Sequence, residues 1–377
     1  MLFENVTQTY QKCDPNEKCK IDQKSAEIAH KLKIDDRVQK FTTDECFLTI
    51  KDHKANFPNS IKCRLINPAK NQLGKVSQHI LRTVIDKLTS TLNLNMWKNT
   101  DNVIDWFTVA DNANARLIKF DIVDFYPSIN KELLNKALAF AMSHVAISED
   151  DLELINHTKS SLLFDGTSTW KKKSGVFDVT MGSYDGAECC EIVGIYLLNK
   201  LSKIIRPDQH GLYRDDGLGL IPNTTGPKQD RLRKDIIRLF KSEGLDVTCE
   251  ANLTIYDFLD IELHSQNRKY APHRKPNDSP CYINKGSNHP PSVIKQIPVM
   301  IEKRLSKLSS NEEAFNKSVP IYQEALLKSG YTEKLAFQHD EKASSTQNQR
   351  KRRRHILWFN PHSTKTEKQI SVRFFFN

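Results

Sequence analysis

Three aspartates in two short segments are the residues of this chain whose chemistry is easiest to name. Asp121 lies in the stretch FDIVDFYPSI, and Asp215 and Asp216 follow Tyr213 and Arg214 in the stretch YRDDG. Mg²⁺ prefers oxygen ligands, and phosphoryl transfer commonly uses two such ions about 3.5–4 Å apart. Carboxylates brought together from neighbouring strands would meet that need and would point to nucleotidyl transfer. An isolated pair of aspartates, in contrast, more often marks a solvated turn.

The residues around these aspartates predict the elements that would position them. On either side of residues 214–217 the pattern predicts a strand, a tight turn and a second strand, with the aspartates at the tip. In residues 117–122 every second residue is Ile or Phe, so Asp121 is expected near the end of a strand. After Asn130, a good N-cap, apolar residues at 3.6-residue spacing predict a helix.

The segments that carry the aspartates, and others along the chain, resemble the motifs of a known family. FDIVDFY resembles motif A of reverse transcriptases, and YRDD resembles their motif C. Between them, MGSYDGAECCEIVG at residues 181–194 resembles motif B, a glycine-containing loop and helix that support template and incoming nucleotide. LFKSEGLDV resembles motif D, and FLDIEL at residues 258–263 resembles motif E, the primer-gripping turn. In residues 259–263 apolar side chains alternate with acidic ones, which predicts a strand there. These motifs occur in the family's order, which makes the match far more specific than any one of them alone.

The segment at residues 47–77 resembles the fingers hairpin of the same family, whose basic residues clamp the triphosphate. The candidates for contact with the triphosphate are Lys54, Lys62 and Arg64. The arginine would bind phosphate oxygens through its bidentate fork, and the lysines would act as point charges. More narrowly, five segments are similar to those of reverse transcriptases of Penelope-like retroelements, which usually carry a GIY-YIG endonuclease. These segments are KDHKANF, CRLINPAK, MGSYDGAE, KPND and SNHPPSVIKQIP. Beyond HILWFNPHS the chain departs from that pattern, and the interpretation is a truncated copy that lacks the endonuclease.

The resemblance implies an α/β fold of the α+β kind, with the architecture of a right-hand polymerase. The palm would be built on an antiparallel sheet, and the thumb would be helical. Residues 1–45 are expected to form a helical lead-in, 46–115 the fingers, 116–265 the palm with motifs A to E, 266–335 the thumb, and 336–377 a basic, flexible tail. The cluster of arginines in that tail is typical of a nucleic-acid or nuclear-targeting patch, and equally of a solvated tail.

The implied activity is that of a retrotransposon RNA-directed DNA polymerase, a nucleotidyltransferase that adds dNMP to a primer 3′-hydroxyl. Asp121 and Asp215 are expected to bridge two Mg²⁺ ions, for which Mn²⁺ can substitute, and Asp216 is the supporting carboxylate. In the family's geometry the backbone carbonyl of Ile122 completes the shell of the second metal. The implied partners are an RNA template, a DNA or RNA–DNA duplex, and dNTPs.

Further positions are candidates for the nucleotide pocket. Tyr126 lies five residues beyond Asp121, where retroviral relatives place an aromatic gate against the ribose 2′-hydroxyl. The alternative for Tyr126 is a core aromatic at the end of a strand. Met181 stands where family members often have Gln. Contacts at that position are therefore expected from thioether packing or from the backbone near Gly182.

A second group of candidates follows motif E. From residue 291 apolar side chains recur at helical spacing, and four basic residues lie outside that face: Lys295, Lys303, Arg304 and Lys307. This suits a thumb that grips the backbone of a duplex, although a solvated basic face would look the same. The position after motif E favours the thumb. Pro298 is expected to interrupt this helix. Ser310 with Glu313 resembles a capping box that opens another helix.

Composition limits the class of protein. The 377 residues contain 56 basic and 46 acidic side chains, a formal charge of +10 that favours a polyanionic partner. The eight cysteines form no CxxC pair and signal neither a disulfide framework nor a zinc site, which favours a reducing compartment. No apolar run approaches the roughly 20 residues of a membrane span. The expectation is an intracellular protein of the nucleus or cytoplasm, without a membrane partner.

Two alternative functions remain open. A catalytically decayed copy of the element would keep the fold and the basic surface and would bind nucleic acid without polymerising it. A different two-metal enzyme, such as a nuclease, would use similar carboxylates. The fingers hairpin and the motif B loop favour the polymerase.

Overall fold

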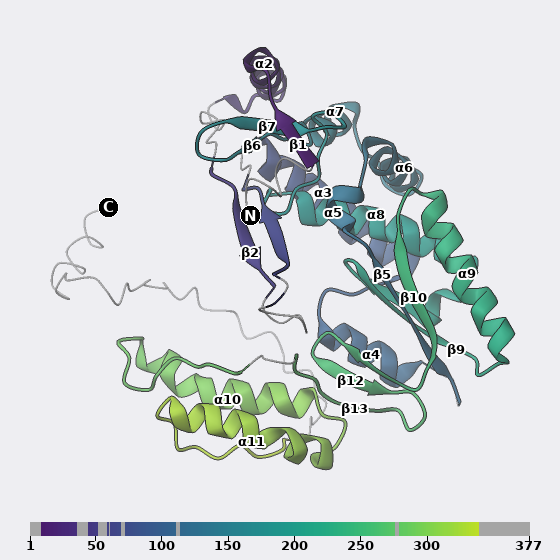
Figure 1. Cartoon of the computed structure of the whole chain (residues 1–377), viewed down its shortest axis with the longest axis vertical. Helices are drawn as coiled ribbons and strands as arrows, with labels where there is room; N and C mark the ends of the chain where they lie inside the picture. Colours follow the sequence, from purple (N-terminus) through teal and green to yellow (C-terminus); the bar gives the residue numbers. More distant parts are fainter. Residues whose placement is uncertain are drawn as a thin grey trace. The chain divides into compact units, whose positions relative to one another are not determined.

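A computed structural model of the chain describes residues 9–35, 44–51, 59, 61–68, 72–110, 114–275 and 279–338. These residues divide into two units (Figure 1). The first comprises residues up to Phe258 together with His264–Arg268, and the second comprises Leu259–Leu263 and the residues from Lys269 onward. The predicted roles of Lys54 and of the tail arginines at 350–354 lie outside the described residues.

A five-stranded sheet with the strand order β10-β5-β9-β8-β4 forms the centre of the first unit. Its strands are β4 (Asn95–Met96), β5 (Arg116–Ile122), β8 (His210–Tyr213), β9 (Asp216–Ile221) and β10 (Val247–Leu253). β5 pairs antiparallel with both β9 and β10, and β8 pairs antiparallel with β9, whereas β4 runs parallel to β8. The predicted strand that contains Asp121 and the predicted hairpin that contains Asp215 and Asp216 are therefore confirmed.

Helices pack on one face of this sheet because every second residue of β5 is apolar on that side. Ile118, Phe120 and Ile122 are buried in one core together with side chains of the packing helices, which are α3 (Gln72–Leu92), α6 (Lys131–Met142), α8 (Gly186–Leu201) and α9 (Gly226–Ser242). The rings of Phe120 and Phe240, for example, lie 5.6 Å apart. Asn130 caps α6 as expected, since its side chain accepts from the Leu133 N–H at 2.8 Å.

The other elements of the first unit surround this core. The hairpin of β2 (Phe47–Ile50) and β3 (Cys63–Ile66) and the sheet of β1 (Tyr10–Lys12), β7 (Thr169–Lys172) and β6 (Leu163–Phe164) are separate from the central sheet. The remaining elements are α2 (Pro15–Lys31), α4 (Thr100–Val109), α5 (Phe125–Ser128), α7 (Glu149–His157), η2 (Pro207–Gln209) and β11 (Ile255–Phe258). Within the described part of the chain, no helix is both long and apolar enough to cross a membrane.

The second unit is built on two helices. It contains β12 (Ile261–His264), most of which belongs to it, β13 (Lys269–Pro272), α10 (Pro291–Lys307) and α11 (Glu312–Lys328). Both helices contribute to its core, whose buried members are Ile294, Ile301, Leu305, Phe315, Leu326 and Tyr331.

Three sequence predictions in this region were wrong in detail. The run 259–263 is not one strand, because Leu259 adopts a left-handed φ of 54° and a turn separates β11 from β12. Pro298 does not interrupt α10, since it is buried within a continuous helix whose packing offsets the missing backbone hydrogen bond. The N-cap of α11 is Asn311, which accepts from the Ala314 N–H at 2.9 Å, and not Ser310.

A close fit between two side chains fixes the register of β5 and β9. Gly217 is the direct partner of Phe120, and a Cβ atom at Gly217 would lie 1.9 Å from the Phe120 ring. Phe120 is buried against α9 and has little room to move. Only glycine fits opposite this ring, which explains the glycine that follows the two aspartates.

We therefore expect Gly217→Ala to lower the free energy of unfolding by about 1–3 kcal/mol, the usual cost of overpacking a core. Gly226→Ala is the control, because a Cβ atom there meets nothing within 4 Å and its φ is not positive. That control should change stability by less than about 1 kcal/mol. Urea denaturation of both variants measures the difference. Equal stability of the two would show that the β5–β9 pair does not depend on this fit.

Candidate active site

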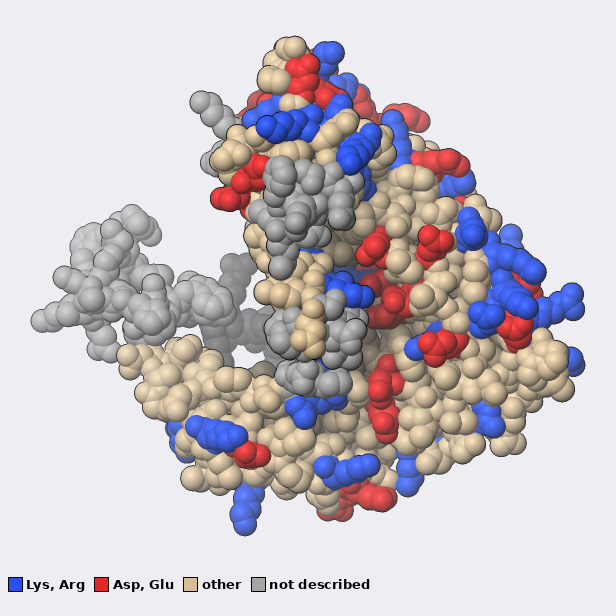
Figure 2. Space-filling view, in the orientation of Figure 1, with Lys and Arg blue, Asp and Glu red and all other residues tan. Residues whose placement is uncertain are grey.

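The three predicted aspartates lie at one end of the central sheet. Asp121 and Asp216 are direct register partners on β5 and β9. Opposed residues of an antiparallel pair point to the same face, with Cβ atoms about 4.5–5.5 Å apart. Asp215 lies in the turn between β8 and β9, and its carbonyl accepts a hydrogen bond from the Ile122 N–H at 3.0 Å. Asp121 and Asp215 are exposed, and Figure 2 shows acidic side chains gathered over the region of β5 and β10.

A tyrosine and a lysine lie on the same face as these carboxylates. Lys119 precedes Asp121 by two positions in β5, forms an ion pair with Glu250 at 3.0 Å, and lies 4.8 Å from the centre of the Tyr256 ring. Burial raises the pKa of Tyr256 to about 12, and the charges of Asp216 and Asp121 act in the same direction. Tyr256 is therefore a neutral phenol close to the carboxylates at neutral pH.

The carboxylates have the right chemistry for the predicted Mg²⁺ ions, because all three offer hard oxygen ligands at one strand end. Register alone brings Asp121 and Asp216 together, and the turn adds Asp215. Across the ranges that the structure describes, however, no group of three Asp, Glu, His or Cys side chains is arranged to hold a metal ion. The donor types fit the cofactor, and the register of β5 and β9 brings two of the three carboxylates together.

Tyr126 joins the two segments that carry the aspartates. It lies in α5, directly after the strand of Asp121, and is half-buried. The guanidinium of Arg214, next to Asp215, donates a hydrogen bond to the Tyr126 hydroxyl at 3.1 Å. Burial raises the pKa of Tyr126 to about 12, so that the hydroxyl stays protonated at neutral pH.

The hairpin of β2 and β3, which is the predicted fingers hairpin, is attached to the predicted motif B loop. The Asn67 N–H, one residue beyond β3, donates to the Met181 carbonyl at 2.9 Å. Gly182 has a φ of +115°, and a Cβ atom there would lie 2.7 Å from the Asn67 carbonyl oxygen. The loop therefore needs glycine for its conformation and for its contact with the fingers. Lys62 and Arg64 are exposed, and Arg64 lies on β3.

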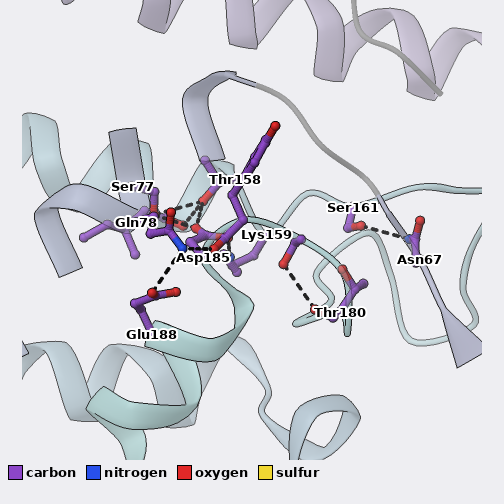
Figure 3. Close-up of polar contacts among 12 residues, drawn as sticks. Asn67, Ser77, Gln78, Thr158, Lys159, Ser161, Thr180, Asp185 and Glu188 are labelled. Carbon is purple, nitrogen blue, oxygen red and sulfur yellow. Dashed lines mark hydrogen bonds and ion pairs between the residues drawn. The ribbon is translucent and has the colours of Figure 1, made fainter. Parts of the chain in front are cut away.

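A buried polar cluster holds the other end of the motif B loop (Figure 3). Asp185, which precedes α8, accepts hydrogen bonds from the hydroxyls of Ser77 at 2.6 Å and Thr158 at 2.9 Å and pairs with the ammonium of Lys159. Lys159 and Asp185 are each only 1% exposed. Burial alone lowers the pKa of Lys159, but the neighbouring Cys189 and Asp185 raise it above its ordinary value, so the lysine remains charged.

The same cluster continues along α8. Glu188 accepts from Arg82 at 2.7 Å and from Gln78 at 3.1 Å, both on α3. Contacts from α3 and from the segment after α7 thus fix the start of α8 and the loop before it. The sequence alone does not predict this cluster. Asp185 and Glu188 lie in the motif B stretch, but nothing in the sequence around Lys159 indicates that its side chain is buried beside them.

We expect Lys159→Met to lower the free energy of unfolding by about 3–5 kcal/mol, because the Asp185 carboxylate would stay buried without its cation. Adding Asp185→Asn should recover part of that stability by removing the uncompensated charge. Lys98→Met is the control, since its pair with Asp86 is exposed and such pairs contribute about 0–1 kcal/mol. Thermal and urea unfolding measure the stability of Lys159→Met, of the double variant and of Lys98→Met. A small effect of Lys159→Met would show that water enters the cluster.

The fold of this chain is similar to that of solved structures. No protein-family model matches the sequence, and no curated protein matches it. Among solved structures, telomerase from Candida albicans in complex with a TWJ fragment of telomeric RNA is similar with a TM-score of 0.54 at 11% identity, over 87% of this chain and 59% of that chain. Apo telomerase from Candida tropicalis gives a TM-score of 0.51 at 11% identity, over 87% and 60%. The fold is that of a right-hand polymerase.

The predicted α/β class and right-hand architecture are thus confirmed. The RNA-dependent RNA polymerase of a human picobirnavirus is also matched, with a TM-score of 0.48 at 11% identity, over 76% of this chain and 60% of that chain. This chain spans about three fifths of the length of each of these three structures.

The basic candidates of the second unit lie on α10. Lys295, Lys303, Arg304 and Lys307 are all exposed. Arg304 forms an ion pair with Asp260 at 2.8 Å, so part of its charge is already compensated within the unit. Lys295 and Lys303 are therefore the better candidates for contacts with phosphate.

Proposed function

We propose that this chain is an RNA-directed DNA polymerase of a Penelope-like retrotransposon. The observation that carries the proposal is the register pair of Asp121 and Asp216, with Asp215 in the adjoining turn, at one end of the central sheet. The right-hand polymerase fold supports it, because the fold supplies a palm sheet for the carboxylates and a fingers hairpin joined to a loop beside them.

In this proposal a primer 3′-hydroxyl attacks the α-phosphate of a dNTP, a new phosphodiester bond forms, and pyrophosphate leaves. Asp121 and Asp215 would hold two Mg²⁺ ions, assisted by Asp216 and by the carbonyl of Ile122. When bound, such ions lower the pKa of the attacking hydroxyl and neutralise the charge of the leaving group. The hydrogen bond from the Ile122 N–H to the Asp215 carbonyl keeps the two segments of the site together.

The remaining residues would position the substrates. Lys62 and Arg64 would neutralise the β- and γ-phosphates, and Lys54, in the same segment, would act with them. The Tyr126 ring would exclude a ribose 2′-hydroxyl. The backbone of the motif B loop at Met181 and Gly182 would support the incoming nucleotide, and this loop is fixed at both ends, by Asn67 and by the cluster around Asp185.

The test is Mg²⁺-dependent incorporation of dNTPs on a primed RNA template. We expect Asp121→Asn and Asp215→Asn each to lower the rate by about a hundredfold or more, because metal ions supply several kcal/mol of transition-state stabilisation. Asp124→Asn is the matched control: it makes the same change three residues from Asp121, at an exposed position with a φ of 45° that Asn also tolerates.

Two outcomes would contradict the proposal. If the wild-type protein and both variants bind the primed template equally well but none extends the primer, the chain is a binding-only remnant. If the wild type shortens the strand instead of extending it, and Asp121→Asn stops this, the carboxylates serve a nuclease.

The partners would be an RNA template and a DNA or RNA–DNA duplex, held in part by α10. We expect Lys295→Ala combined with Lys303→Ala to weaken binding of an RNA–DNA duplex. The slope of log K against log salt should fall by about 0.9 for each phosphate that the double variant no longer neutralises. Lys328→Ala on α11 is the control, because its ammonium pairs with Glu324 at 2.7 Å. Titrations of duplex binding at several salt concentrations measure the slopes. An unchanged slope in the double variant would show that Lys295 and Lys303 face solvent and do not contact phosphate.

A further inference from the structure

The residue between the tyrosine and the aspartates of motif C has an unusual conformation and an unusual partner. Arg214 adopts a left-handed φ of 55° in the turn between β8 and β9. Few residues other than glycine adopt this region, and they concentrate at functional sites. The Arg214 guanidinium donates to the Tyr126 hydroxyl at 3.1 Å, across 88 residues of sequence. This hydrogen bond joins motif C to motif A through side chains.

The Tyr126 ring is also held from the side of α8. A Cβ atom at Gly186, the first residue of α8, would lie 3.5 Å from Cε1 of Tyr126, so the ring rests against the backbone there. Arg214 acts on the opposite end of the side chain, at the hydroxyl. An aromatic ring that is packed on one edge and hydrogen-bonded at its tip has few alternative positions.

Arg214 is itself restrained. It is half-buried, and the nearby Tyr126 and Glu191 of α8 favour the charged guanidinium against the effect of burial and raise the pKa of Arg214. The guanidinium is planar and carries its donors in a fixed fork, so a side chain that is partly enclosed can donate in few directions. The left-handed turn, the partial burial and the hydrogen bond to Tyr126 together restrain Arg214.

We infer that Arg214 is a positioning residue that sets sugar specificity, because it holds the Tyr126 ring where it excludes the 2′-hydroxyl of a ribonucleotide. The inference rests on the proposed function and extends it to a residue outside the carboxylate set. Discrimination between dNTP and rNTP is a difference of two affinities. A ring that can move away would admit the ribonucleotide while still allowing the deoxyribonucleotide.

The experiment compares single-nucleotide incorporation of dNTP and rNTP by Tyr126→Phe, Arg214→Met and the double variant. Tyr126→Phe keeps the ring and removes only the hydrogen-bond acceptor. Each single variant should lower the ratio of kcat/KM for dNTP over rNTP by roughly tenfold, in keeping with a hydrogen bond to a charged group. The change should come from easier use of rNTP. The double variant should show no lower ratio than either single variant, because both substitutions remove the same hydrogen bond.

Two controls separate this role from a structural one. Tyr126→Ala removes the ring and should abolish the discrimination almost completely. Arg238→Met, at an exposed arginine of α9 paired with Asp235, should leave the ratio unchanged. Thermal unfolding of every variant shows whether a change in ratio accompanies a loss of stability.

The outcomes distinguish the inference from the proposed function. If the wild type incorporates dNTPs but Arg214→Met and Tyr126→Phe leave the ratio at the wild-type value, the positioning role of Arg214 is overturned while the polymerase stands. If Tyr126→Ala also leaves it unchanged, Tyr126 is no gate at all. If the wild type incorporates neither nucleotide although it binds the primed template, the proposed function fails, and the sugar selection fails with it.

Discussion

The antiparallel register of β5 and β9 is the constraint on which the rest of the site depends. Side chains alternate between the two faces of a strand, so a slip of one residue would move Asp121 from the face of Asp216 to the face packed against the helices. The fit of the Phe120 ring over Gly217 opposes that slip, because a shift of one residue would place the ring opposite Asp216 or Leu218, which have side chains. A packing contact in the core thus determines the position of charged groups at the surface.

Helix α8 connects this strand pair to the other parts of the site. Its first residue, Gly186, lies beside the Tyr126 ring. Its third residue, Glu188, accepts a hydrogen bond from Arg82 of α3. Asp185, which precedes the helix, pairs with the buried Lys159. A buried ion pair contributes little net stability, but removing one partner is costly, so the pair strongly disfavours any other position of this segment. The loop before α8 is therefore held between the end of β3 and the start of the helix.

Local patterns in the sequence predicted much of this arrangement. The alternation of residues 117–122, the turn after Tyr213 and the cap at Asn130 depend on neighbouring residues, and the structure has them as expected. The exceptions depend on distant contacts. Leu259 interrupts an alternation typical of a strand, Pro298 is accommodated by the packing of α10, and Lys159 is buried by residues distant in the sequence. The hydrogen bond from Arg214 to Tyr126 likewise required the fold before it could be recognised.

In the proposed function the three aspartates at this strand end form the metal-binding centre of a polymerase. The most direct test is a crystal structure of the protein with a primed RNA template, a non-reactive dNTP analogue and Mn²⁺, in which anomalous scattering locates the ions. We expect anomalous peaks coordinated by the carboxylates of Asp121 and Asp215, with the α-phosphate of the analogue beside them, and loss of these peaks in Asp121→Asn. Ordered primed template and analogue without a metal peak at these carboxylates would contradict it.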